Sequence, residues 1–169
     1  MKLPRTFDAP TARWFRAALR RPAPFASVRV KRDHAKVVQW MRRQGVVVAT
    51  ADIVGLWGPE SSRTTGGTMR GHNVVILGHH VHPDRKRLFL ALHEAGHVIQ
   101  YAMGFRTPAR MKVRKGRYVF LKRDDEHTRS ETMAYLLGTA LAENLRIKLD
   151  QRAWRAFNWE ARRDKRRKR

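Results

Sequence analysis

Residues 87–99 of the chain read Arg-Leu-Phe-Leu-Ala-Leu-His-Glu-Ala-Gly-His-Val-Ile. Apolar residues recur through this stretch at helical spacing, and with its flanks it predicts a long helix over residues 83–103 that Gly104 ends. His93 and His97 stand four residues apart, which places both imidazoles on one face of the helix, one turn apart. Each imidazole can give a nitrogen to the same Zn²⁺ ion. The stretch therefore predicts a zinc site carried by a helix.

Glu94 follows the first histidine and lies about 100° further round the helix. From there its carboxylate can reach a water molecule at the metal without displacing either imidazole. H-E-x-x-H hydrolases use a glutamate in this place as the general base. A purely structural zinc site has no need of it, so Glu94 favours catalysis.

The chain contains no cysteine, so a transition-metal site must be built from histidines and carboxylates. A catalytic zinc site needs a third protein ligand beside the two histidines, and one open position. Metzincins place a further Gly and His along the same helix, but Gln100 and Met103 occupy those positions here. The third ligand is therefore expected from another part of the chain.

A second long helix is predicted over residues 128–147 from its apolar spacing. Glu131, near its start, is the best candidate for the third ligand, and Glu126 and His127 are the alternatives. Thr128 and Glu131 also fit a capping box, in which the glutamate only bonds back to the N-cap amide. A helix that begins several residues before Thr128 would leave Glu131 free for the metal.

These features resemble the ImmA/IrrE-type minigluzincin metallopeptidases. In that family a strand leads into the H-E-x-x-H helix, and a later helix carries a glutamate followed at the third position by an alanine. Residues 73–77 read as the strand, and Glu131 and Ala134 match the later helix. The family usually has Asn or Asp directly after that alanine, where Tyr135 stands here. The run over residues 130–138 is also similar to the metallopeptidase domains of ArdC-like antirestriction proteins from mobile elements.

The resemblance covers residues 72–145 and implies an α+β, zincin-like domain. Such a domain has a small sheet, the H-E-x-x-H helix and a second helix that bears a glutamate. The implied activity is that of a zinc metalloendopeptidase acting on a protein substrate. Glu94 would be its general base, and the metal ligands would be His93, His97 and Glu131.

A peptidase must also stabilise the oxyanion that forms on the scissile carbonyl. His127 is the favoured donor, and the alternatives are Tyr101, Tyr118 and Tyr135. The substrate main chain is expected to pair with an edge strand beside the cleft. Either residues 119–121 or residues 74–77 are expected to supply that strand.

Positive charge is concentrated toward both ends of the chain. The 169 residues carry 37 Lys and Arg against 14 Asp and Glu, for a formal net charge of +23. We therefore expect a basic N-terminal arm over residues 1–32, a zincin-like metallopeptidase domain over residues 33–149, and a basic aromatic tail over residues 150–169.

Such a charge favours non-specific contact of the two arms with DNA or RNA. Trp154, Phe157 and Trp159 would be stacking surfaces in the tail. The alternative is that these aromatics pack on the domain and the tail is a solvated run. The alternative function is thus a nucleic-acid-associated or antirestriction-type protein that acts mainly by binding. No apolar run approaches the roughly 20 residues that span a bilayer, and the N-terminus lacks the apolar core of a secretory signal. We expect a cytoplasmic protein with no membrane partner.

The remaining elements are predicted from local patterns. The N-terminal arm is expected to be loosely structured, with a short helix over residues 11–20. After it we expect a helix from Asp33 that Gly45 ends, a strand over residues 46–50, a long loop over residues 55–71 and a strand over residues 113–121.

Overall fold

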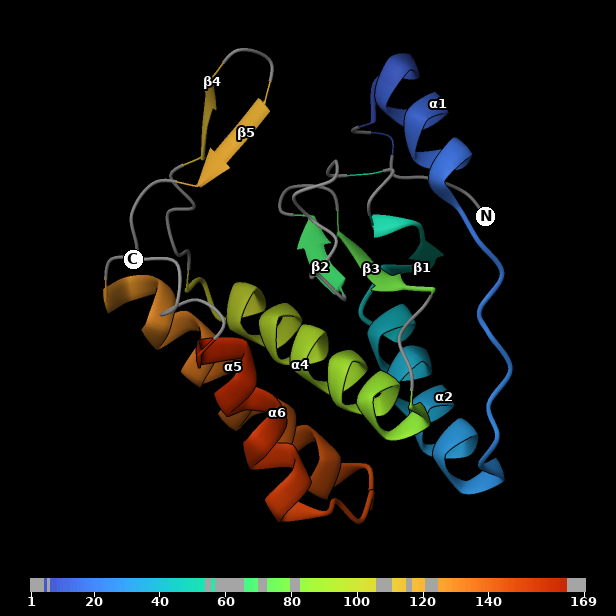
Figure 1. The fold of residues 1–169 in the computed structure, drawn as a ribbon, viewed down its shortest axis with the longest axis vertical. Helices are drawn as coiled ribbons and strands as arrows, with labels where there is room; N and C mark the ends of the chain where they lie inside the picture. Colours follow the sequence, from blue (N-terminus) through green and yellow to red (C-terminus); the bar gives the residue numbers. More distant parts are fainter. Residues whose placement is uncertain are drawn as a thin grey trace. The chain divides into compact units, whose positions relative to one another are not determined.

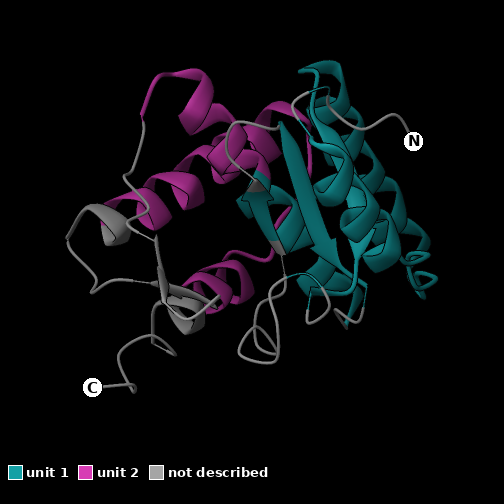
Figure 2. Cartoon of the chain, turned by 90° about the horizontal axis from the view of Figure 1, so that it is seen from above, with its two compact units in different colours: residues 1–94 teal, residues 95–169 magenta. Residues whose placement is uncertain are grey.

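The computed structural model describes residues 5, 7–53, 56, 66–69, 73–79, 83–105, 111–114, 117–120 and 125–163. Their helices and strands (Figure 1) are, in chain order, α1 (Ala9–Ala18), α2 (Val28–Arg43), β1 (Val47–Ala51), β2 (Gly66–Met69), β3 (Val74–Gly78), α4 (Asp84–Ala102), β4 (Met111–Arg114), β5 (Arg117–Phe120), α5 (Asp125–Asn144) and α6 (Gln151–Arg163). Close contacts group the chain into two compact units, residues 1–94 and residues 95–169 (Figure 2). The fold is α+β, as predicted.

The first unit is built on a mixed sheet with the strand order β1-β3-β2. β1 runs parallel to β3, and β2 runs antiparallel to it. All five residues of β3 are buried, as befits a central strand. Both edges of β3 are already paired, so the expectation that residues 74–77 receive a substrate strand is wrong. Among the described strands of this sheet, β2 is an edge strand.

Helix α1 packs on one face of the sheet. Its N-cap Asp8 accepts a hydrogen bond from the Thr11 amide at 2.7 Å, which stabilises the first turn. Phe15 and Ala18 are buried in one cluster with Ala49 and Ala51 of β1, among other residues. The short helix expected over residues 11–20 is therefore confirmed, two residues earlier in the chain. It is not part of a loose arm, because buried apolar side chains hold it on the core.

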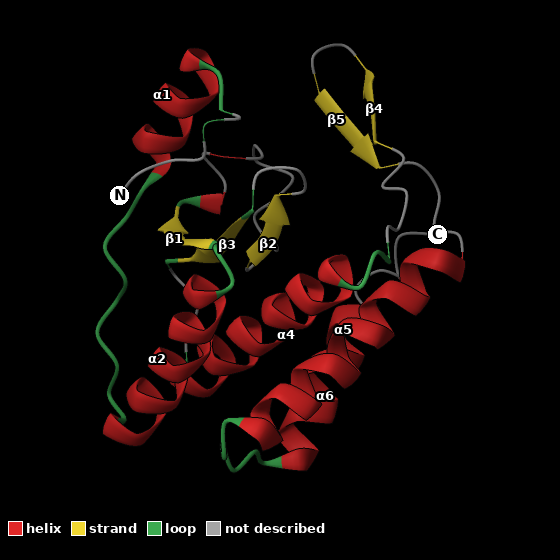
Figure 3. Ribbon diagram, turned by 180° about the vertical axis from the view of Figure 1, so that it is seen from behind, coloured by secondary structure: helices red, strands yellow, loops and turns green. Residues whose placement is uncertain are grey.

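Helix α2 contacts β1 (Figure 3). It begins at Val28, with Ser27 as N-cap, five residues before the predicted start. Asp33, expected to open the helix, is an interior residue whose buried carboxylate is surrounded by cations. These cations are Arg29, Arg32 and Lys36, at 3.9, 3.6 and 3.6 Å. The helix end is as predicted, with Gly45 in the left-handed region at φ 76°.

The start of α4 is tied to the segment that joins α1 to α2. The Ser27 amide donates to the Asp84 carboxylate at 2.7 Å. The Arg87 guanidinium donates to the Pro24 carbonyl at 3.1 Å and lies 3.6 Å from the centre of the Phe25 ring. These contacts anchor residues 24–27 on the helix that carries both histidines.

His34 of α2 lies beside the same cluster. Its ring centre is 5.0 Å from that of Phe25. Burial, and secondarily the positive charge of Arg87, lower the pKa of His34 from 6.5 to about 4. The imidazole is therefore neutral in the folded protein at neutral pH.

Two predicted elements differ from those observed. Residues 55–71 were expected to form a loop, but they contain the strand β2. Outside β2, the structure describes only Leu56 of this segment. The strand predicted over residues 113–121 is a hairpin of β4 and β5 in which Met111 pairs with Phe120. The sequence has a glycine, Gly116, inside that segment, and glycine favours a turn over one continuous strand. Leu121 lies outside the described residues.

In the second unit, α6 is anchored through Trp154, whose side chain is 0% exposed. The indole nitrogen donates to the hydroxyl of Thr139 on α5 at 2.8 Å, and the ring lies 5.3 Å from that of Tyr135. Trp154 therefore packs on the protein, as the second of the two interpretations expected, and does not offer a stacking surface to nucleic acid. Phe157 stacks on Trp154 at 5.9 Å, and the side chain of Trp159 lies outside the described part.

Candidate metal centre

Three side chains predicted as ligands come together. His93 and His97 of α4 and Glu131 of α5 place ligand atoms within 4.8 Å of one another. Nε2 of His97 lies 3.7 Å from Oε1 of Glu131. Both histidines are 8% exposed and Glu131 is partly buried. Two imidazole nitrogens and a carboxylate oxygen form a donor set that suits Zn²⁺, so the residues present fit a metal ion.

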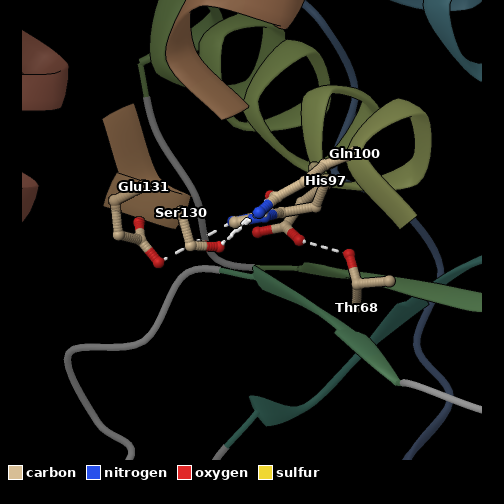
Figure 4. A network of polar contacts seen from close by, with 6 residues as sticks. Thr68, His97, Gln100, Ser130 and Glu131 are labelled. Carbon is tan, nitrogen blue, oxygen red and sulfur yellow. Dashed lines mark hydrogen bonds and ion pairs between the residues drawn. The ribbon is translucent and has the colours of Figure 1, made fainter. Parts of the chain in front are cut away.

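The start of α5 determines what Glu131 can do. The helix begins at Asp125, so Thr128 already lies inside it and is not the N-cap. The capping-box interpretation of Glu131 is therefore wrong, and its carboxylate is directed to His97 (Figure 4). Glu126 and His127 lie in the first turn of α5, and their side chains are outside the described part of the chain.

Gly96 explains how closely α4 and α5 approach each other. A Cβ atom at this position would lie 2.0 Å from the carbonyl oxygen of Ala134 and 2.9 Å from its Cα atom. No side chain fits there, because real Cβ atoms essentially never come within 3.0 Å of another heavy atom. Gly96 precedes the candidate ligand His97, and Ala134 follows Glu131 by about one turn. The absence of a side chain at Gly96 therefore lets the two helices that carry the candidate ligands meet.

A buried hydrogen-bond chain lies behind His97 (Figure 4). Oε1 of Gln100 is 3.0 Å from Nδ1 of His97. Nε2 of Gln100 donates to the Ser130 hydroxyl at 2.9 Å. Because an amide oxygen can only accept, this contact favours the tautomer of His97 with the proton on Nδ1. In that tautomer the lone pair is on Nε2, the atom that lies 3.7 Å from Glu131.

Glu94 also has a partner that the sequence did not suggest. The hydroxyl of Thr68 on β2 donates to Oε2 of Glu94 at 2.8 Å (Figure 4), and Glu94 is 4% exposed. The bond fixes one carboxylate oxygen of Glu94.

The three tyrosines named as oxyanion donors have different environments. Tyr101 stacks on His97, with ring centres 5.8 Å apart and planes at 15°. Tyr135 packs against Trp154, in the apolar packing between α5 and α6. The side chain of Tyr118 lies outside the described part. Of the three, Tyr101 is seen beside the ligand set.

Comparison of the chain with protein-family models, with curated proteins and with solved structures found no match. No helix in the described part of the chain is both long and apolar enough to cross a membrane.

Proposed function

We propose that the protein is a zinc-dependent metallopeptidase that hydrolyses peptide bonds of a protein substrate. The observation that supports this most directly is the grouping of His93, His97 and Glu131 on two helices. Glu94, adjacent to the first ligand in the sequence, supplies a base that a structural metal site would not need. The finer assignment to a zincin-like, minigluzincin fold rests on the sequence resemblance.

A zinc ion bound by these residues would polarise the scissile carbonyl and make a water molecule more acidic. The protein's own part is proton transfer and orientation. Oε1 of Glu94 takes the proton from water and later passes it to the leaving amine, while Oε2 stays bonded to Thr68. His127 is retained as the proposed oxyanion donor, with Tyr101 as the alternative that lies against His97.

The substrate strand is proposed to pair with β2. This strand is at an edge of the described sheet, and its Thr68 touches the proposed base. An extended peptide added to β2 would be held through main-chain hydrogen bonds. Peptides with N-methylated amides at the pairing positions are expected to be cleaved poorly. Unchanged cleavage of such peptides would contradict pairing at β2.

Metal content and Glu94 together test the proposal. Elemental analysis of the purified full chain should find about one zinc per chain, lost in Glu131→Ala and kept in Glu126→Ala. The zinc-loaded protein should cleave members of a fluorogenic peptide library. Glu94→Gln should keep zinc and lose cleavage. No zinc after reloading, or native cleavage by Glu94→Gln, would refute the proposal.

A second candidate function is suggested by the charge. Arg13 and Arg16 on α1 and Arg152 and Arg155 on α6 are exposed, in a chain of net charge +23. These side chains are proposed to hold DNA or RNA backbones without reading sequence. Affinity should fall steeply with salt, and deletion of residues 161–169 should weaken it. Binding that is absent or insensitive to salt would exclude this function.

A further inference from the structure

Gln100 occupies an unusual place for a polar side chain, since it is only 2% exposed in the interior of α4. Its oxygen contacts Nδ1 of His97 at 3.0 Å. Its nitrogen donates to Ser130 at 2.9 Å, and the Ser130 hydroxyl also donates to the Gln100 oxygen at 3.2 Å. Ser130 is 3% exposed. A buried amide is costly unless it is bonded, so these contacts explain how Gln100 is tolerated there.

We propose that Gln100 is a positioning residue for the metal ligand His97, and that Ser130 holds the Gln100 amide in place. This inference rests on the proposed metal site. Gln100 keeps the proton of His97 on Nδ1 and fixes the plane of the ring. Nε2 then presents its lone pair toward Glu131.

Two consecutive residues of α5 are linked to the two ring nitrogens of His97, one directly and one through Gln100. Glu131 lies 3.7 Å from Nε2 of His97, and Ser130 acts on Nδ1 of the same ring through Gln100. The close approach of Gly96 to Ala134 occurs one turn along from the contact of Gln100 with Ser130. Both contacts fit one register of the two helices. A shift of α5 by one residue would therefore disturb both ring nitrogens of His97.

The expected effect follows from the role of such outer partners in metal sites. A ligating histidine usually donates its other N–H to a fixed acceptor, and loss of that acceptor costs about 10–100-fold in metal affinity. Gln100→Leu removes the acceptor and keeps a similar volume. Gln100→Glu keeps an acceptor oxygen. Gln39→Leu, at an exposed position of α2, is the matched control.

The test measures zinc affinity by chelator competition, and the tautomer of His97 by long-range ¹H–¹⁵N correlation on the metal-free chain. Gln100→Leu should bind zinc about 10–100-fold more weakly and show His97 with its proton shared between both nitrogens. Gln100→Glu and Gln39→Leu should resemble the unmutated protein. Ser130→Ala removes only a hydroxyl and should show the same tautomer change to a smaller extent. This variant keeps the test valid if Gln100→Leu fails to fold.

Native affinity together with an unchanged Nδ1–H tautomer in folded Gln100→Leu or Ser130→Ala would overturn the inference. That outcome is distinct from failure of the proposed function, in which the unmutated protein itself would bind no zinc. Peptidase activity is not needed for either readout, so the substrate need not be known.

Discussion

The substitution Gly96→Ala gives the sharpest test of how the two ligand-bearing helices meet. In an ordinary helix interior this change stabilises by about 0.5–1 kcal/mol, because alanine restricts the unfolded chain. Here the new methyl group would lie 2.0 Å from the Ala134 carbonyl oxygen, whereas ordinary contact begins at 3.4 Å. The two backbones would have to separate locally by about 1.4 Å, the difference between these distances. Overpacking of this kind costs about 1–3 kcal/mol, so the sign of the effect should reverse.

The same displacement should reach the metal site. His97 is the next residue after Gly96, and Glu131 is about one turn before Ala134. Ligand distances in metal sites tolerate only about 0.2 Å of deviation, so Gly96→Ala is expected to lose zinc as well as stability. Zinc per chain and the free energy of unfolding in urea are the two measurements. Gly104→Ala is the control, since nothing lies within 4 Å of its Cβ position. It should cost about 1–2 kcal/mol through its positive φ and leave zinc bound.

A Gly96→Ala protein that is as stable as the unmutated chain and holds a full complement of zinc would refute this reasoning. It would mean that α4 and α5 can separate without disturbing the ligands. Loss of zinc from Gly104→Ala to the same extent would refute it too, because the effect would then not depend on the contact with Ala134.

Three further predictions concern other parts of the chain. Thr68→Val, which removes the hydrogen bond to Glu94, should lower peptide turnover roughly tenfold with zinc content unchanged, and Thr68→Ser should restore it. His34 has a pKa of about 4 when folded and 6.5 when unfolded, so the unfolded chain binds the extra proton between these values. The contribution of His34 to the free energy of unfolding should therefore be fully present above pH 6.5 and fall by about 3 kcal/mol as the pH is lowered to 4. In urea titrations, His34→Gln should reduce this pH dependence. Trp154→Ala should lower the free energy of unfolding by about 3–5 kcal/mol, and a loss below 1 kcal/mol would show that α6 is not held by this side chain.

Local patterns in the sequence were enough to predict the parts of the site that lie on one helix. The bounds of α4, the strands β1 and β3 and the candidate ligands His93 and His97 all follow from spacing over a few residues. Glu131 required a second helix, and its interpretation depended on where that helix begins. The observed start at Asp125 removes the capping alternative.

The hydrogen-bond partners of the site could not be predicted in this way. Thr68 lies 26 residues from Glu94, and Ser130 lies 30 residues from Gln100. Contacts of this kind depend on which elements are neighbours in space, and no periodicity reports that. The one usable signal was Gln100 itself, a polar residue that lies about one turn after His97 on the same helix.

The terminal segments were predicted only in part. A short helix was expected near the N-terminus, but the many arginines favoured solvated arms over helices that pack on the protein. In α1 the buried positions are Phe15 and Ala18, three residues apart. In α6 Trp154 is buried, and Phe157, three residues further along, stacks on it. Each is a helical spacing that predicts one buried face, which long basic side chains on the other faces do not contradict.

The anchoring of residues 24–27 on α4 bears on how short a fragment of the chain can fold. A fragment trimmed to residues 33–149, the limits that charge density suggests, would lack the Ser27 amide and the Pro24 carbonyl. Asp84 and Arg87 would lose these partners at the start of the histidine-bearing helix. We expect such a fragment to be digested by trypsin far faster than a fragment that begins before α1 and has the same C-terminal end. Its vulnerable point would be the first turns of α4, upstream of both histidines.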